Sequence, residues 1–365
     1  SMVRLGVLCE AGTGVPKDES KAVSWYQMAA GLGNPEGMTN LAVLLRQGKG
    51  TEANYPEAAR LLETASELQN PRAMYLSGLL YLEGDEQHPR DERHAFRLFL
   101  DAAEAGYEKA WHAVAHCREN GIGTLANPVR AATDYRLAAE YGLPDAQFRY
   151  AVLLRLGEVV RQNDEESFRW LSKAAAQGHP DAICELGYYY DKGIAVQKDP
   201  IRARHLFEEA GSLGCARAMT NLAQLYAVGR GVEADEEKAV SLFLQAADAG
   251  DPVAMTRIGE MYENGVGVKQ QKDLSKALHW YRRASKGGDL VASGALERMR
   301  VMFRDMFRRS LFMTAGLSAA GLIALILSLV GVFPLVTGIL AGLCFLGDLA
   351  IAGMTLPLLK QYFYF

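Results

Sequence analysis

Two histidines stand four residues apart, His112 and His116, so that on a helix both imidazoles would share one face. This spacing suits two ligands of a zinc ion, because imidazole is a common zinc ligand. Neither histidine belongs to an HExxH motif, and no third ligand is evident beside them. We therefore expect no metal and no other cofactor.

Other motifs that support catalysis are also missing from the sequence. Pairs such as Gly265 and Gly267 recur, but they follow expected helices rather than strands, and no GxxxxGK[ST] loop is present. No Ser, His and Asp residues are set in a nucleophile elbow. We predict that the chain is not an enzyme. A catalytic or metal-dependent protein is the alternative that metal analysis of the purified chain would test.

Charge and cysteine content limit the partners and the compartment. The net charge of -4 and the lack of a basic stripe argue against nucleic acid. Five cysteines are an odd number and show no pairing pattern, which indicates a reducing compartment. No secretory signal opens the chain, and residues 1–14 resemble the end of a repeat already begun. The sequence alone leaves open whether an upstream segment or signal peptide is missing.

Internal repetition is the strongest signal in the sequence. Three series of residues recur with a step of 36, apart from two places where the loop inside a repeat is longer. Glycines that end an expected first helix are Gly12, Gly48, Gly84, Gly121, Gly157, Gly193, Gly229 and Gly265. Small residues early in an expected second helix are Ala22, Ala58, Ala95, Ala131, Ser167, Ala203, Ala239 and Ala277. Closing positions are Gly33, Gln69, Gly106, Gly142, Gly178, Gly214, Gly250 and Gly288.

Each first helix also carries one small residue at an equivalent place, which we call the small-residue position. We predict that it lets two helices approach closely. Its members are Ala42, Gly78, Ala115, Ala151, Gly187, Ala223 and Gly259.

The repeated motif resembles a known family. Residues 258–288 contain Ile-Gly-x-x-Tyr-x-x-Gly-x-Gly-Val, followed by Asp, Lys-Ala, Trp-Tyr, Ala and Gly, and residues 5–33 contain a close variant. This string resembles the Sel1-like repeat signature, and the resemblance covers roughly residues 3–295. Some repeats depart from it, as where Leu61 and Leu62 replace Trp-Tyr.

The resemblance implies an all-α fold. We expect a TPR-like α-solenoid of about eight helix-turn-helix repeats, wound as a right-handed superhelix of antiparallel pairs. Family members are similar to adaptors that assemble complexes, often at membranes. Stacked repeats of this kind form a long concave surface. We predict that a protein partner binds there, with a merely solvated helix face as the alternative. The candidate residues are Asn40, His116, Arg149, Glu185, Tyr188, Asn221, Gln224, Arg257 and Glu260.

The C-terminal part of the chain is apolar. Residues 311–332 and 335–356 are each long enough to span roughly 30 Å, the thickness of a hydrocarbon core. Only Phe333 and Pro334 separate them, which predicts a two-helix transmembrane hairpin. A buried soluble hairpin is the alternative. We therefore divide the chain into a solenoid (1–297), an amphipathic basic juxtamembrane helix (298–310), the hairpin (311–359) and a short cytosolic tail (360–365).

Charged residues around the hairpin predict its orientation and contacts. Arg300, Arg304, Arg308 and Arg309 would lie on anionic headgroups and keep both ends of the hairpin in the cytosol. Asp348 would lie within the membrane, where a carboxylate is costly without a partner. Gly338 and Gly342 would permit close helix packing. An integral membrane protein or a second copy of the chain is the expected partner there.

These observations predict a membrane-anchored scaffold or adaptor. It would be a multi-pass protein of the cytoplasmic (inner) membrane, with its repeats facing the cytosol. It would recruit or regulate partners of a membrane complex such as a synthase, an export system or a quality-control assembly. The alternative is a sensor-effector whose repeats control oligomerisation and membrane permeabilisation by the hairpin. Ion leakage from liposomes would distinguish the two.

Overall fold

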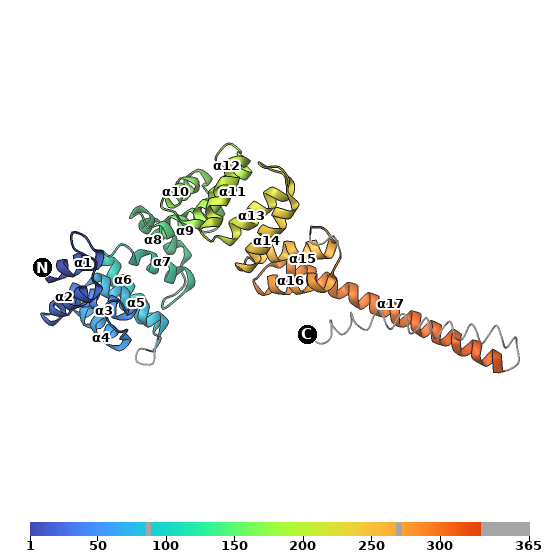
Figure 1. Ribbon diagram of the computed structural model, residues 1–365, viewed down its shortest axis with the longest axis horizontal. Helices are drawn as coiled ribbons and strands as arrows, with labels where there is room; N and C mark the ends of the chain where they lie inside the picture. Colours follow the sequence, from blue (N-terminus) through green and yellow to red (C-terminus); the bar gives the residue numbers. More distant parts are fainter. Residues whose placement is uncertain (85–88, 268–271, 330–365) are drawn as a thin grey trace. The chain divides into compact units, whose positions relative to one another are not determined.

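The computed structural model describes residues 1–84, 89–267 and 272–329. Over these ranges the chain is made of helices joined by turns, with no strand among them (Figure 1). The chain divides into two compact units, Ser1–Glu209 and Ala210–Phe365, and the division falls inside one helix, α12. The prediction of an all-α repeat fold is confirmed.

Sixteen of the helices form eight pairs, and a seventeenth follows them. The first helices of the pairs are α1 (Met2–Ala11), α3 (Pro35–Gln47), α5 (Pro71–Glu83), α7 (Ala110–Asn120), α9 (Pro144–Leu156), α11 (Pro180–Lys192), α13 (Ala216–Val228) and α15 (Pro252–Asn264). The second helices are α2 (Glu19–Gly31), α4 (Tyr55–Glu67), α6 (Glu92–Glu104), α8 (Pro128–Glu140), α10 (Asp164–Ala176), α12 (Pro200–Ser212), α14 (Glu236–Asp248) and α16 (Leu274–Lys286). The last helix is α17 (Leu290–Leu329).

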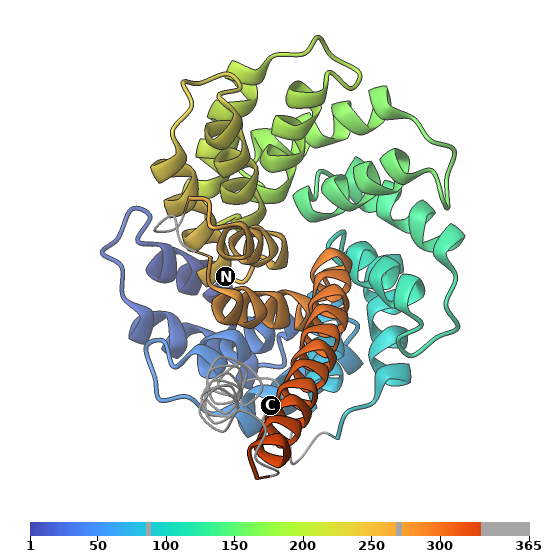
Figure 2. The same cartoon turned by 90° about the vertical axis from the view of Figure 1, so that its right-hand side faces the viewer.

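Packing within each unit follows the order of the chain. A first helix contacts the second helix of its own pair, and that second helix contacts the first helix of the next pair, as with α3, α4 and α5. Figure 1 and Figure 2 show the same neighbours from two directions. Since a single pair leaves one face uncovered, each pair completes its core only through the pair beside it.

Capping residues explain why the second helices begin where they do. An Asp or Asn side chain accepts a hydrogen bond from the backbone N–H three residues later at the start of every second helix. These caps are Asp18, Asn54, Asp91, Asn127, Asn163, Asp199, Asp235 and Asp273. Such a cap typically contributes about 1 kcal/mol to helix stability.

Backbone conformation confirms two of the predicted series. All eight predicted helix-ending glycines have positive φ, between 63° at Gly48 and 73° at Gly12, Gly193 and Gly265. The eight closing positions also have positive φ, including Gln69 at 63°. A side chain added at most of the closing glycines would meet no neighbour within 4 Å, so conformation rather than space favours glycine there.

The small-residue position lies against a large side chain of the paired second helix. An added Cβ would stand 2.6 Å from the Phe99 ring at Gly78, and 2.7 Å from the Phe207 and Tyr281 rings at Gly187 and Gly259. Each of these rings is almost fully buried. The predicted close approach of the helices is confirmed, and each ring burial contributes about 2–3 kcal/mol of transfer free energy.

Helix α17 crosses two of the expected domain boundaries, 297/298 and 310/311, without a break. The predicted basic residues Arg300, Arg304, Arg308 and Arg309 are all exposed along it. On its apolar face, Met299 and Phe303 are buried within the protein. That face therefore packs at least in part against the chain rather than facing outward.

No helix among the described residues has both the length and the hydrophobicity that crossing a bilayer requires. The structure therefore does not support the expected transmembrane hairpin. Its first segment largely coincides with the end of α17, and its second segment, with Gly338, Gly342 and Asp348, lies outside the described residues.

Candidate protein-binding surface

The nine candidate residues lie on first helices at two equivalent places. One place is two residues before the small-residue position and holds Asn40, Arg149, Glu185, Asn221 and Arg257. The other is one residue after it and holds His116, Tyr188, Gln224 and Glu260. Residues three apart lie on the same side of a helix, so the two places form one face of each first helix.

Two candidate residues are buried and join neighbouring first helices. Asn40 on α3 is 9% exposed, and its side-chain oxygen accepts a hydrogen bond of 2.7 Å from Arg72 on α5. Glu185 on α11 is 6% exposed, and its carboxylate lies 3.6 Å from the Nε of Arg155 at the end of α9. These side chains stabilise the stacking of repeats, which leaves them little surface for a partner.

Arg149 forms a similar link between α7 and α9. Its guanidinium donates two hydrogen bonds to the Glu119 carboxylate, the longer one 3.3 Å from Nε. The buried Tyr135 hydroxyl also donates to this carboxylate, at 2.9 Å. We call such a contact a rung. It joins two neighbouring first helices: the residue two before the small-residue position of the later helix contacts the residue four after the small-residue position of the earlier helix. Arg149 with Glu119 and Glu185 with Arg155 are rungs.

The electrostatics of the α7–α9 rung follow from burial and from these hydrogen bonds. Burial raises the pKa of Glu119, but the hydrogen bonds from Arg149 and Tyr135 outweigh burial, and the pKa is lowered overall. Burial, with the Glu119 contact added, raises the pKa of Tyr135. Burial lowers the pKa of His112, whereas the neighbouring candidate His116 is exposed. The rung therefore holds the Glu119 carboxylate ionised at neutral pH.

A second kind of link between first helices was not predicted. The residue three before a small-residue position contacts the residue that follows the closing position of the same repeat. The contact is a hydrogen bond in Thr39–Asn70 and Thr220–Asp251, and a ring contact in Tyr75–Tyr107 and Phe148–His179. The matching chemistry of each couple, polar with polar and ring with ring, was a signal in the sequence.

Gln224, Arg257 and Glu260 are brought together around a cavity. It has a volume of about 520 Å³ and lies between α13 and α15, over Phe243 of α14. Ala227 also lines it, and Ala227 occupies the place where Glu119 and Arg155 provide rungs elsewhere. Because an alanine cannot pair with Arg257, this rung is missing and the space remains open.

Two charged side chains at this cavity, Arg257 and Glu260, are held only weakly. Arg257 lies 2.8 Å from Glu260 one turn along the same helix, with side chains 48% and 33% exposed. Ion pairs so exposed typically contribute less than about 1 kcal/mol, so a partner can replace this one at small cost. Val228 and Val266 add apolar surface beside them, exposed by 67% and 56%. A cavity with an apolar floor and replaceable charges suits a protein side chain.

The remaining candidates lie apart from this cavity. Tyr188 is half-buried, with the Lys192 ammonium 5.7 Å from its ring centroid. Asn221 is half-buried on α13. Among residues 1–84, 89–267 and 272–329, no three His, Cys, Asp or Glu side chains are arranged to hold a metal ion.

Two solved structures resemble the chain in fold. One is c5321, a protective antigen of uropathogenic Escherichia coli, with a TM-score of 0.65 and 27% identity over 88% of this chain and 71% of that one. The other is a Sel1 repeat protein from Oxalobacter formigenes, with a TM-score of 0.63 and 29% identity over 68% of this chain and 96% of that one.

Two relatives are described as regulators. Chitin synthase regulatory factor 2 of Schizosaccharomyces pombe is 32% identical over 191 residues, which are 49% of this chain and 37% of that protein. An exopolysaccharide production negative regulator of Rhizobium leguminosarum bv. viciae is 33% identical over 147 residues, 36% of this chain and 54% of that protein. The chain thus spans about half or less of the length of these relatives.

The family model of the Sel1 repeat matches eight consecutive segments of the chain. They are residues 1–34, 35–70, 71–107, 110–142, 144–179, 180–215, 216–251 and 252–289. Each segment contains one of the eight helix pairs. The chain therefore belongs to the Sel1 repeat family.

Proposed function

We propose that this chain is a non-catalytic adaptor that regulates an assembly producing a cell-surface polysaccharide, and that the α13–α15 cavity holds its protein partner. The observation that carries this proposal is the missing rung at Ala227, which leaves three candidate residues around an open cavity. Support for the polysaccharide assembly comes from the two regulators among the relatives.

The chemistry of the cavity suggests how a partner would bind. An apolar side chain of the partner would cover Phe243 and Met261 and exclude water from them. The Gln224 amide can donate and accept hydrogen bonds with the partner's backbone. Arg257 and Glu260 would exchange their mutual ion pair for charges on the partner, which sets the orientation more than the affinity.

A photo-crosslinking amino acid tests this proposal. Placed at Val228, which is 67% exposed beside the cavity, it should form an adduct with a polysaccharide-synthesis protein in cells. Val129 on α8 is the matched control because it is 66% exposed and remote in sequence from the cavity. Equal adducts from both positions, or none from Val228, would contradict the proposed binding surface.

Membrane attachment is a further part of the proposal. It is supported by residues 311–359, in which Asp348 is the only formally charged side chain. The segment would anchor the repeats to the cytosolic side of the cytoplasmic membrane, with Gly338, Gly342 and Asp348 contacting a membrane protein or a second copy. The chain should then resist alkaline extraction from membranes, and its repeats should be protected from protease added outside spheroplasts. Release of the chain by alkali would contradict the anchor.

A further inference from the structure

A second cavity lies in the other unit, far along the sequence from the one already described. It has a volume of about 620 Å³ and is formed by α2, α3 and α4. Leu41, Leu45 and Leu61 contribute apolar surface, and Glu57, Arg60 and Thr64 contribute polar groups. Ligand pockets commonly have volumes of about 300–1,000 Å³, so the cavity is large enough for a ring system.

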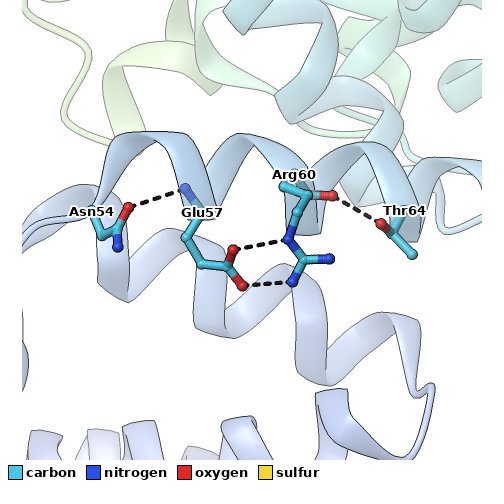
Figure 3. Close-up of polar contacts among 4 residues, drawn as sticks. All are labelled: Asn54, Glu57, Arg60 and Thr64. Carbon is cyan, nitrogen blue, oxygen red and sulfur yellow. Dashed lines mark hydrogen bonds and ion pairs between the residues drawn. The ribbon is translucent and has the colours of Figure 1, made fainter.

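Figure 3 shows how the polar groups are held along α4. The Asn54 side chain caps the helix by accepting from the Glu57 backbone N–H at 3.1 Å. The Arg60 guanidinium donates two hydrogen bonds to the Glu57 carboxylate, at 2.8 and 2.6 Å. Thr64 bonds the backbone carbonyl of Arg60 at 2.9 Å. The Glu57 carboxylate is therefore fixed in place on the polar side of the cavity.

The same positions recur in the repeat formed by α9 and α10. Several positions hold the same residue type in both repeats: Asn163, Glu166 and Arg169 correspond to Asn54, Glu57 and Arg60. Leu154 likewise matches Leu45. Among the lining residues that differ, Leu41, Leu61 and Thr64 are replaced by Tyr150, Trp170 and Lys173.

In the α9–α10 repeat an indole ring occupies the corresponding space. The Trp170 ring packs edge-on against Tyr150, with centroids 6.0 Å apart, and beside Leu154. The Trp170 Nε1–H donates to the Glu166 carboxylate at 3.4 Å, and the Lys173 ammonium lies 3.9 Å from the ring centroid. The carboxylate and the cap of this arrangement are present in the α3–α4 repeat, but the indole is not.

We propose that the α2–α4 cavity binds a tryptophan side chain of a partner protein, with Glu57 accepting the indole N–H as Glu166 does within the chain. The cavity provides room where Leu41 and Leu61 are smaller than Tyr150 and Trp170. A carboxylate that already accepts from Arg60 retains lone pairs for another donor. The hydrogen bonds from Arg60 lower the pKa of Glu57, so the acceptor stays ionised at neutral pH.

This site is independent of the α13–α15 cavity and of the function proposed for it. Tryptophan is favoured over an aliphatic side chain because an aliphatic side chain has no donor for the Glu57 acceptor, whereas the indole N–H donates to it. It is favoured over a cationic side chain because the Arg60 guanidinium already compensates the carboxylate charge.

Ligand-observed saturation-transfer NMR on the full chain, with N-acetyl-tryptophan amide as the probe, tests the proposal. The wild-type chain should bind the probe, and N-acetyl-leucine amide should bind more weakly. Leu61→Trp should abolish binding because the chain's own indole would fill the cavity. Glu57→Leu should weaken binding about tenfold, the usual cost of losing a hydrogen bond to a charged group.

Glu166→Leu is the matched control, because it removes the equivalent carboxylate from a repeat whose space is already filled. Probe affinity should be unchanged in this variant. The proposal is overturned if the wild-type chain does not bind the probe, if Leu61→Trp binds it as the wild type does, or if Glu166→Leu weakens binding as much as Glu57→Leu. Circular dichroism checks each fold, and the two glutamate variants decide the matter if Leu61→Trp does not fold.

Discussion

The α7–α9 and α13–α15 contacts use the same helix positions, but Ala227 and Phe243 stand in the second where Glu119 and Tyr135 stand in the first. In the first, Glu119 accepts from Arg149 and Tyr135 and fills the space between the helices. In the second, Ala227 stands where Glu119 would, Arg257 turns to Glu260 on its own helix, and a cavity remains. A polar side chain on a first helix therefore either joins two repeats or stays available to a partner, depending on the preceding repeat.

The largest effect is expected at the small-residue position, which α11 shares with α15 and which packs against a ring in both repeats. Gly187→Val and Gly259→Val each place side-chain atoms against a buried ring, Phe207 or Tyr281. We expect each to lower the free energy of unfolding by about 3 kcal/mol, because overpacking forces a shift of both helices. Urea unfolding followed by circular dichroism measures this. Gly294→Val, which meets nothing within 4 Å, is the control and should have little effect. A loss in only one of the two variants would contradict an equivalent close approach of the helices in these two repeats.

The next largest effect should distinguish the α7–α9 contact from the α13–α15 contact. Glu119→Ala removes the acceptor of a buried tyrosine and of Arg149, and we expect a loss of about 2 kcal/mol. Glu260→Ala removes only an exposed pair within one helix, and we expect a loss of less than about 0.5 kcal/mol. Urea midpoints of the two variants make the comparison. Equal losses would show that the α7–α9 rung does not join the repeats.

A new rung between α13 and α15 should fill the α13–α15 cavity. Ala227→Glu places a carboxylate within the reach of Arg257, and we expect a gain of about 0.5 kcal/mol together with loss of the crosslink from Val228. Ala227→Lys is the matched control, because a like charge should not draw Arg257 across. Retention of the crosslink in Ala227→Glu would argue that the cavity is not where the partner binds.

The smallest expected effect is on the pH dependence of the free energy of unfolding. The pKa of Glu119 is lower in the folded chain than its ordinary value of 4.5, so its contribution to stability is present above that value. This contribution is lost as the pH falls through the lower, folded-state pKa. Stability of the wild-type chain should therefore decline more steeply below about pH 4.5 than that of Glu119→Gln, as measured by urea midpoints. Parallel profiles would contradict this.

Local features of the fold were predictable from the sequence, and contacts between repeats were not. Helix ends depend on residues that cap or bend the chain locally, so Gly265 and Asp273 indicate them directly. The sequence predicts that Asn40 and Glu185 are surface residues, because each lies outside the repeated core positions of its own helix. Their partners, Arg72 and Arg155, lie in neighbouring repeats about as far away as one repeat length. Complementary polar side chains at that separation were the signal that periodicity within a helix does not reveal.

The α2–α4 cavity shows a similar limit of prediction from the sequence. The replacement of Trp-Tyr by Leu61 and Leu62 was visible in the sequence. Of the indoles at that place, Trp170 has a carboxylate four residues before it, whereas Trp25 and Trp280 have a lysine there. The role proposed for Glu57 becomes apparent only when Glu57 is compared with Glu166 of the α9–α10 repeat. A comparison of repeats within one chain therefore supplies information that each repeat alone lacks.

The alanine at position 227 also bears on how the array unfolds. In a linear array, cooperativity depends on the free energy of each interface between neighbours relative to the stability of each repeat. The α13–α15 contact keeps the Thr220–Asp251 hydrogen bond but lacks the rung that joins α7 and α9. We therefore predict that the α15–α16 pair opens as a separate folding unit while α13 and α14 stay folded. A partner seated in the cavity would supply the missing coupling and make the two repeats unfold together.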